Sequence, residues 1–214
     1  MEENVLPLFP LEVVLLPEEP LPLHIFEGRY KTMIGKCLEA QATGEGQEEF
    51  GVLLARDQKM STIGCSARIV NVTRKYEDGR LDILAVGKRR FELLHTRDAK
   101  SYLEGSIEFF DDEGPDAPDD ESAELAIDHF RDLIRKLRHA SEMPVHFPRP
   151  YRYLSFRIAA ALPLDLEFKQ QLLCLRNEQE RTDLVLRAID GLADHLERVE
   201  KSGAKAGGNG NLHH

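Results

Sequence analysis

The chain has 214 residues, of which 42% are hydrophobic and 31% are charged, a balance that is ordinary for a globular protein and too apolar for general disorder. A chain of this length can bury a sizeable core, in one large or two modest domains, without metal ions or disulfides. Its 28 Lys and Arg residues against 38 Asp and Glu residues give a net charge of −10, which argues against a general nucleic-acid coat and against attraction to anionic lipid.

The cysteines and the N-terminus indicate a cellular compartment. Cys37, Cys65 and Cys174 lie far apart and form no CxxC pair, so reduced thiols are expected rather than a zinc site or a disulfide framework. The N-terminus carries glutamates instead of the basic start of a signal peptide, and no apolar run approaches the roughly 20 residues of a transmembrane helix. These features predict a cytoplasmic protein that is not bound to a membrane.

The first part of the chain has the pattern of short strands, interrupted by one helix. Asp78-Gly79 is a favoured hairpin pair, and Gly87 is expected to break the strand that returns from it. The spacing of the strands predicts a compact barrel or sandwich in a domain of residues 1–112. Apolar runs predict strands at 13–16, 50–54, 67–73, 81–86, 91–94 and 102–110, and one apolar helical face is formed by Tyr30, Met33, Ile34, Cys37 and Leu38, before the glycines at 44 and 46.

The second part of the chain changes to a helical period. The acidic, Pro- and Gly-bearing stretch at 111–120 is expected to be solvated, and residues 113–120 are assigned as a linker. Apolar stripes then predict an all-α bundle over 121–201, with Asp119 or Asp120 capping its first helix and Asp165 a later one. The tail at 202–214, rich in Gly and Asn, has no apolar anchor and is predicted to be disordered.

Motifs that carry catalysis are absent from the sequence. It contains no GxxxxGK[ST] phosphate loop, no GxGxxG after a strand, no GxSxG elbow and no HExxH. Scattered active-site residues stay open, but an enzyme is not the favoured interpretation, and no cofactor or metal is expected. His24, which lies among apolar residues, is more typical of a hydrogen-bonded core or edge residue than of a metal ligand.

One basic cluster adjoins an aromatic residue. Lys88, Arg89 and Arg90 precede Phe91, a pattern that nucleic-acid binders use for phosphate contact with base stacking. The alternative is a solvated turn whose arginine stems cover apolar surface. The net charge of −10 favours the second interpretation.

The most specific signal is a set of short motifs. LPLFPL at 6–11, VLLP at 14–17 and LPLHIFEGRY at 21–30 resemble the opening of the Lon substrate-binding domain, which is the N-terminal domain of ATP-dependent Lon proteases and is also found alone and in cereblon-like proteins. Gly28 stands where the family commonly has proline, and Cys65 where it commonly has threonine. The resemblance covers about residues 5–200, through FGV at 50–52, IG at 63–64, ARI at 67–69, DGR at 78–80, GKRRF at 87–91, LSFRIA at 154–159, LPL at 162–164 and KQQLL at 169–173.

The resemblance implies an α+β fold in which a PUA-like β-barrel is followed by an all-α helical bundle. It also implies a non-catalytic protein- or peptide-binding module, because in Lon proteases cleavage belongs to a separate domain with a Ser–Lys dyad and unfolding to an ATPase module. The chain is therefore expected to be a stand-alone copy of this domain, without the ATPase and peptidase domains. The implied partners are unfolded or peptide-like protein clients, with a protease or chaperone acting in trans.

The family motif also implies a binding surface. Because the motif gathers there, the expected substrate-binding residues are His24, Glu27, Arg29, Tyr30, Arg90 and Phe91. The same residues could instead form a structural joint between the barrel and the first helix, an interpretation favoured for Tyr30 and Phe26, whose phase points inward.

Two other classes of function stay open. PUA-like barrels also occur in RNA-modifying proteins, and Lys88, Arg89 and Arg90 would carry RNA binding, with a steep dependence on salt. An enzyme or small-ligand protein would need two carboxylates or a Cys–His pair in one pocket, which the sequence does not place.

Overall fold

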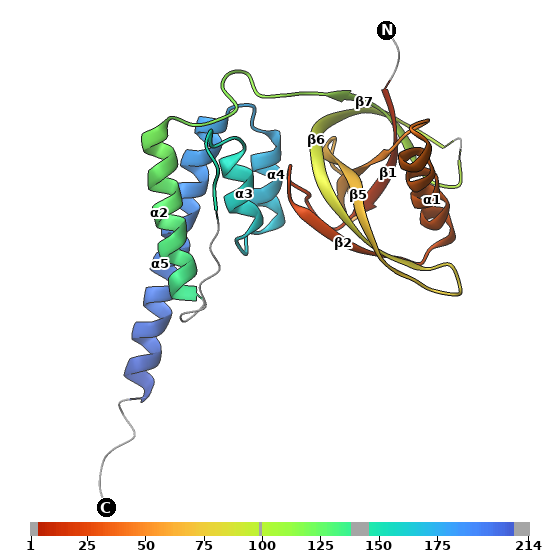
Figure 1. Cartoon of the computed structure of the whole chain (residues 1–214). Helices are drawn as coiled ribbons and strands as arrows, with labels where there is room; N and C mark the ends of the chain where they lie inside the picture. Colours follow the sequence, from red (N-terminus) through yellow and green to blue (C-terminus); the bar gives the residue numbers. More distant parts are fainter. Residues whose placement is uncertain (1–3, 99, 138–145, 208–214) are drawn as a thin grey trace, which may run out of the picture. The chain divides into compact units, whose positions relative to one another are not determined.

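The computed structural model describes residues 4–98, 100–137 and 146–207, and the chain forms two compact units (Figure 1). The first unit consists of Met1–Glu113 together with Ala159–Arg176, and the second of Gly114–Ile158 together with Asn177–His214. The chain therefore returns to the first unit after entering the second, which the linear division predicted from the sequence did not include.

The first unit is built on a sheet of seven strands, which confirms the mixed α+β class. The strands predicted at 50–54, 67–73 and 102–110 form, and the Asp78-Gly79 pair forms the predicted hairpin turn, with Gly79 at a φ of 80°. The elements are β1 (Asn4–Leu11), β2 (Pro20–Ile25), α1 (Gly28–Thr43), β3 (Glu49–Arg56), β4 (Lys59–Met60), β5 (Ile63–Lys75), β6 (Leu81–Arg97) and β7 (Glu104–Phe109).

The sheet is curled, but it is not the closed barrel that the family resemblance implied. Its strand order is β1-β7-β6-β5-β3-β4, and β1 also pairs in parallel with β3 over four positions, from Leu8 opposite Gly51 to Leu11 opposite Leu54. β2 lies off this path and pairs with β6, while β4 is a two-residue strand beside β3. These two strands leave sheet edges that a closed barrel would not have.

Two of the expected strand limits are wrong, and the two places meet in space. Residues 13–16, predicted as a strand, form an irregular buried segment, and β6 runs through Gly87 instead of breaking there. The Gly87 N–H donates to the Glu19 carbonyl at 3.0 Å, and a Cβ on Gly87 would lie 2.1 Å from the Leu16 carbonyl oxygen. The glycine thus permits a close approach of two backbones rather than a chain break.

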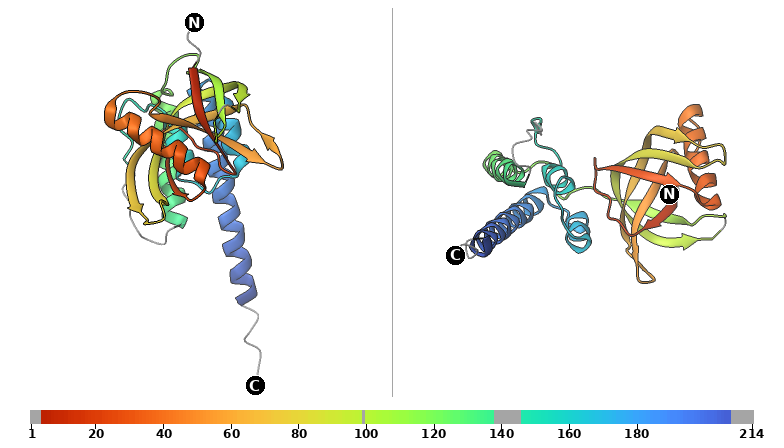
Figure 2. Two further views of the ribbon diagram at one scale, coloured as in Figure 1. Left: turned by 90° about the vertical axis from the view of Figure 1, so that its right-hand side faces the viewer. Right: turned by 90° about the horizontal axis from the view of Figure 1, so that it is seen from below.

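Helix α1 covers one side of the curled sheet (Figures 1 and 2). Its buried face contains Tyr30, Met33, Ile34 and Cys37, as the apolar spacing predicted, and Tyr30 stacks on Phe9 of β1 at a centroid distance of 4.0 Å. The helix ends where the sequence predicted, because residue 44 is a glycine in the left-handed conformation, at a φ of 74°.

The apolar core of the sheet centres on Phe91, which is fully buried. Leu6, Leu8, Leu53 and Ile107 surround its ring. A Cβ on either Gly51 or Gly64 would come within 3 Å of ring atoms of Phe91, so these glycines make room for it. Burying a phenylalanine in such a cluster contributes about 2–3 kcal/mol of apolar transfer free energy.

Helices supply the remaining elements. Asp119 caps α2 (Asp120–Leu137) by accepting from the Ser122 N–H at 2.9 Å, as predicted. Asp165 caps α4 (Leu166–Cys174) by accepting from the Phe168 N–H at 2.7 Å, also as predicted. In the second unit α2 and α5 (Glu178–Gly207) run side by side. Helix α5 continues past Ser202, where a disordered tail was predicted. The reason is that an existing helix gains one hydrogen bond per added residue. The helices are α2 (Asp120–Leu137), α3 (Leu154–Ala160), α4 (Leu166–Cys174) and α5 (Glu178–Gly207), of which α4 belongs to the first unit. Residues 208–214 of the predicted tail lie outside the described residues.

A buried ionic cluster lies in the second unit. The carboxylate of Glu178 accepts from the Ser155 N–H and hydroxyl, both at 2.9 Å, and pairs with Arg181 at 2.5 Å. Both charged side chains are fully buried, and the Arg181 guanidinium lies over the Phe156 ring. This cluster fixes the start of α5 against α3.

Candidate functional site

The structure divides the residues predicted to bind substrate into two groups. His24, Glu27 and Arg29 lie at the surface, at the end of β2 and the start of α1. Tyr30, Arg90 and Phe91 are buried, at 7%, 4% and 0% exposure. A single surface containing all six side chains is therefore not present.

Of the exposed group, His24 forms a ring cluster with its neighbour Phe26 and with Tyr76 and Asp82 of the β5–β6 hairpin. The Nδ1 atom of His24 lies 2.5 Å from Oδ1 of Asp82, and the Tyr76 hydroxyl donates to Oδ2 of the same carboxylate at 2.8 Å. The hydrogen bond with His24 is the main cause that holds the pKa of Asp82 below its usual value, and the hydrogen bond from Tyr76 adds to it. The His24 ring meets the Tyr76 ring edge-on at 5.7 Å and stacks on Phe26 at 5.9 Å. The shared carboxylate thus orients both rings.

Phe26 is the exposed aromatic residue of this cluster. Its side chain is 60% exposed, so the prediction that its phase points inward is wrong, whereas the same prediction for Tyr30 is confirmed. Phe26 follows the alternation of β2, in which Pro20, Pro22 and His24 are exposed and Ile25 is buried, so its side chain falls on the outer face. The sequence prediction assigned the wrong face of this strand to the core.

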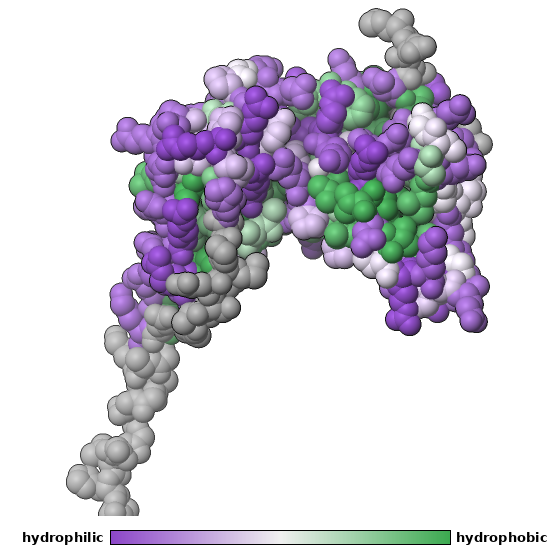
Figure 3. Space-filling view, in the orientation of Figure 1, coloured by the Kyte–Doolittle hydropathy of each residue, from purple (hydrophilic) through white to green (hydrophobic). Residues whose placement is uncertain are grey.

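Apolar residues extend the ring cluster along the outer face of the sheet. β2 pairs with β6 so that Pro22 is opposite Leu84 and Pro20 is opposite Val86, and directly opposed residues share a face. The prolines are exposed and Leu84 and Val86 half-buried. Figure 3 shows apolar side chains gathered over the β2 and β5 region of the first unit. We call the following set the β2 surface: Pro20, Pro22, His24, Phe26, Tyr76, Leu84 and Val86.

Charged residues border the β2 surface. The Arg74 and Arg80 guanidinium groups lie 4.6 and 4.8 Å from the centroid of the Tyr76 ring, within cation–π range. Arg29 pairs with Glu27 at 2.9 Å and lies over the Tyr30 ring. An apolar centre with a charged border is the usual anatomy of a protein-binding surface.

The free edge of β2 is poorly suited to strand addition. Among the described strands β2 pairs with β6 alone, so its second edge is open. Pro20 and Pro22 carry no N–H, which removes two of the donors that an added strand would need. Recognition at this surface would therefore depend on side chains rather than on a backbone ladder.

Arg90 is a structural joint of the first unit. Its guanidinium donates to the Leu173 carbonyl at 3.3 Å and to the Leu175 carbonyl, both at the C-terminal end of α4, and pairs with Asp112 at 2.5 Å. The last carbonyls of a helix have no intrahelical donors, and Arg90 supplies them. Asp112 also departs from prediction, because its side chain is only 3% exposed although the acidic stretch was expected to be solvated.

The basic cluster that could carry RNA binding is consequently incomplete. Arg90 is buried and engaged, and Arg89 lies over the Phe109 ring with Asp111 at 4.0 Å. Only Lys88 and Arg89 remain exposed in this cluster. The arrangement matches the interpretation in which arginine stems cover apolar surface.

The described part of the chain holds no group of three or more His, Cys, Asp or Glu side chains that could bind a metal ion. Burial raises the pKa of Cys37 to about 11 and that of Cys65 to about 12, so both stay protonated thiols at neutral pH. None of the described helices is long and apolar enough to cross a bilayer.

The fold and the surface together define a mixed α+β module that presents an apolar, charge-bordered face. The model of the ATP-dependent protease La (LON) substrate-binding domain matches residues 5–191, and the chain belongs to this family. It is 28% identical to a Lon protease of Parabacteroides distasonis over 83% of its length, and 29% identical to Lon protease 1 of Hydrogenovibrio crunogenus over 92%. The chain spans 23% and 25% of those proteins, respectively.

Solved structures show the same relationship. A Lon N-terminal domain protein from Xanthomonas campestris, 26% identical, superposes with a TM-score of 0.63 and covers 86% of this chain and 98% of its own. The N-terminal domain of a Mycobacterium avium complex Lon protease, 18% identical, gives a TM-score of 0.65 over 90% of this chain and 100% of its own, and supports the fold.

Proposed function

We propose that this chain is a non-catalytic recognition module that binds apolar segments of unfolded or peptide-like proteins on the β2 surface. The observation that carries the proposal is the 60% exposure of Phe26 inside an ordered ring cluster, on the segment that bears the family motif. An isolated exposed aromatic needs no explanation, but one stacked on a histidine and continued by exposed prolines forms a contiguous apolar patch.

The physical chemistry of the surface fits this role. Aromatic side chains supply a large contact area with few rotatable bonds, so binding costs little side-chain entropy. Because the charged residues lie at the border, they steer and orient a client rather than provide most of the affinity. Binding should therefore depend only weakly on salt.

The proposal extends to partners and location. A recognition module acts on a client most simply by delivering it, and we propose a protease or chaperone in trans as the acceptor. We also propose a cytoplasmic location, where the three free cysteines, including the exposed Cys174, would stay reduced.

The test is a fluorescence-anisotropy titration of the purified chain against a labelled unfolded model protein at two salt concentrations. Saturable binding with little salt dependence is expected. Phe26→Ala should weaken it by about tenfold, the size of an aromatic hot spot. Leu94→Ala is the matched control, because Leu94 is 56% exposed but lies outside the β2 surface.

A labelled single-stranded RNA is titrated in parallel. Salt-sensitive RNA binding without binding of the unfolded protein would contradict the proposal and direct attention to Lys88 and Arg89. Equal losses in Phe26→Ala and Leu94→Ala would show that binding is non-specific. Arg29→Gln should have a smaller effect than Phe26→Ala, because Arg29 lies at the border.

A further inference from the structure

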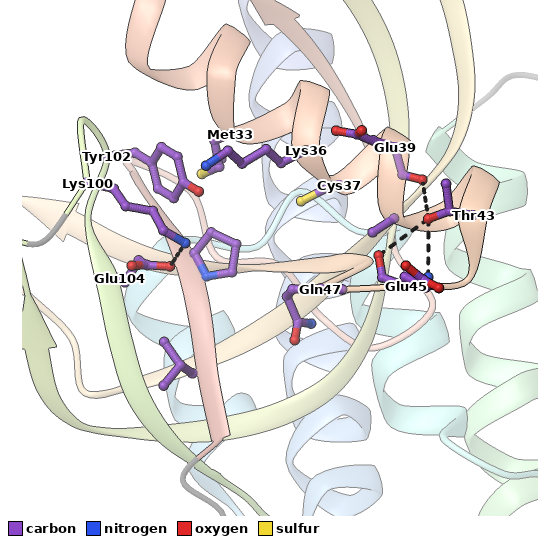
Figure 4. Close-up of a pocket in the computed structure, with 14 residues that line it drawn as sticks. Met33, Lys36, Cys37, Glu39, Thr43, Glu45, Gln47, Lys100, Tyr102 and Glu104 are labelled. Atoms are coloured by element: carbon purple, nitrogen blue, oxygen red, sulfur yellow. Dashed lines mark hydrogen bonds and ion pairs between the residues drawn. The ribbon is translucent and has the colours of Figure 1, made fainter.

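A second concave site lies in the first unit, along the C-terminal half of α1 (Figure 4). It is an open pocket of about 620 Å³, between α1, β1 and the segment that leads into β7. This volume falls within the range of ligand-binding sites. It shares no lining residue with the β2 surface.

One end of the pocket is basic. The Nζ atoms of Lys36 and Lys100 lie 5.8 and 5.5 Å from the centroid of the same ring, that of Tyr102. Glu104, which is 8% exposed, pairs with Lys100 at 2.6 Å. Among the residues that the structure describes, Lys36 forms no ion pair, so this end keeps one uncompensated positive charge.

The other end of the pocket is acidic. Glu45 lies there, beside Thr43, whose hydroxyl accepts from the Glu45 N–H at 3.2 Å, and Glu39 lies on α1 between Lys36 and Thr43 (Figure 4). Within the described ranges neither carboxylate has a cationic partner. The two ends therefore carry opposite charge.

The floor between the charged ends is apolar. Met33, Cys37 and Ala40 are each at most 4% exposed, and all three line the pocket. The Cys37 thiol is neutral, because burial raises its pKa to about 11. An occupant with an apolar middle and oppositely charged ends would match all three parts.

The length of the pocket sets the size of the occupant. Lys36 and Thr43 are seven residues apart on α1, which corresponds to about 10 Å at 1.5 Å per residue. An extended peptide advances about 3.3 Å per residue, so roughly three residues would span the two ends.

We propose that this pocket binds the free C-terminal end of a client peptide, with the terminal carboxylate between Lys36 and Lys100. An apolar side chain would rest on Met33, Cys37 and Ala40, and a basic side chain at the third position from the end would face Glu39 and Glu45. The inference rests on the proposed function, because it names which part of a protein client a second site would hold.

A free C-terminus fits better than an internal acidic side chain. The carboxylate of a chain end lies directly on the backbone, so it can reach the two ammonium groups while the preceding residues follow the floor. The Tyr102 hydroxyl lies at the same end and can donate to the same group. Unfolded or cleaved proteins always present such an end.

The test uses the full chain and three N-terminally fluorescein-labelled pentapeptides. The first is Gly-Gly-Lys-Ala-Leu with a free carboxylate, the second its C-terminal amide, and the third has Glu in place of Lys. The free acid should bind about tenfold more tightly than the amide, and the Glu peptide should bind more weakly than the Lys peptide.

Variants locate the effect. Lys36→Gln should remove most of the difference between acid and amide, because Lys36 carries the uncompensated charge. Lys88→Gln is the matched control, an exposed lysine outside the pocket. Leu94→Ala, at an exposed residue outside both the pocket and the β2 surface, should leave the binding of the pentapeptides unchanged.

The outcomes separate this inference from the proposed function. If the unfolded protein binds in a Phe26-dependent manner but acid and amide bind equally, the pocket proposal is overturned and the β2 surface stands. If only the pentapeptides bind, with loss in Lys36→Gln, the pocket stands and the β2 surface does not. No binding of either ligand overturns both.

Discussion

The segments 21–30 and 87–91 both carry the family motif. The first runs from β2 into α1 and the second lies on β6, the strand that pairs with β2, yet key side chains of the two segments end in opposite environments. In the first, His24 and Phe26 remain at the surface, held by Asp82 and by stacking. In the second, Arg90 and Phe91 are buried, one in the joint with α4 and the other in the core.

This difference shows that membership of a motif does not distinguish a binding surface from a structural joint. Whether a motif side chain is buried or exposed depends on where its hydrogen-bonding partner lies. Arg90 finds the unsatisfied carbonyls at the end of α4, and a cation that replaces their missing donors is drawn into the interior. His24 finds a carboxylate that is itself at the surface. Mutations in the two segments should therefore act on different quantities.

The largest effect is expected for Phe91→Ala. Removing a fully buried phenylalanine should lower the free energy of unfolding of the first unit by about 3–5 kcal/mol, through lost transfer free energy and the cavity left behind. Urea unfolding followed by circular dichroism measures the loss. Phe26→Ala is the control and should stay within about 0.5 kcal/mol of the parent. Equal losses would erase the distinction between the segments.

Arg90→Met should lower the free energy of unfolding by about 3 kcal/mol or more, because it leaves the Asp112 carboxylate buried without its cation. The double variant Arg90→Met/Asp112→Leu removes both charges and should recover part of the loss. Labelling of the Cys65 thiol, opposite Arg90 on β5, gives an independent measurement of opening. An Arg90→Met chain that unfolds at the parental urea concentration would contradict the role of Arg90 as a joint.

Local features of the fold were predictable from the sequence. Helix α1 follows from the spacing of Tyr30, Met33 and Ile34, and its end follows from Gly44. Asp119 and Asp165 cap their helices because a short acidic side chain reaches the N–H three residues on. Such signals need only neighbouring residues.

The features that the sequence did not reveal depend on distant residues. Arg90 meets Leu173, 83 positions away, and the reason for Gly87 is the Leu16 carbonyl. Neither partner has a pattern that points to the other. For the candidate site, the residues His24, Glu27 and Arg29 that the motif pointed to lie at the surface. The contribution of Tyr76 and Asp82 required the pairing of β2 with β6.

Gly87→Ala tests the close approach of the two backbones. The added Cβ would lie 2.1 Å from the Leu16 carbonyl oxygen, and main-chain atoms must move to accept it. The free energy of unfolding should fall by about 1–3 kcal/mol. Gly35→Ala, in the exposed part of α1 with open space around it, should instead raise it by about 0.5–1 kcal/mol. The same sign for both changes would refute the steric argument.

Gly28→Pro should stabilise the exposed segment. Gly28 is the first residue of α1, where a backbone N–H has no intrahelical acceptor, and Glu27 before it is already extended, at φ −71° and ψ 137°. Nothing lies within 4 Å of an added Cβ. The free energy of unfolding should rise by about 0.4–1 kcal/mol, through lower entropy of the unfolded chain. A decrease would show that residue 28 is confined by packing as residue 87 is.

The smallest effect is expected for Asp82, because the pair that it forms with His24 is solvent-exposed. Hydrogen bonds from His24 and Tyr76 lower the pKa of Asp82 in the folded chain, so its contribution to stability is present above the unfolded pKa, about 4, and is lost as pH falls through the lower folded value. The difference in unfolding free energy between the parent and Asp82→Asn should therefore shrink below about pH 4. Glu108→Gln, an exposed acid on β7, controls for the loss of one charge. Client binding should weaken over the same pH range, since protonation of Asp82 releases the His24 ring, which stacks on Phe26, and the Tyr76 ring, which meets His24 edge-on. A difference that stays constant with pH would mean that the carboxylate does not organise the β2 surface, and that the rings hold their places by packing alone.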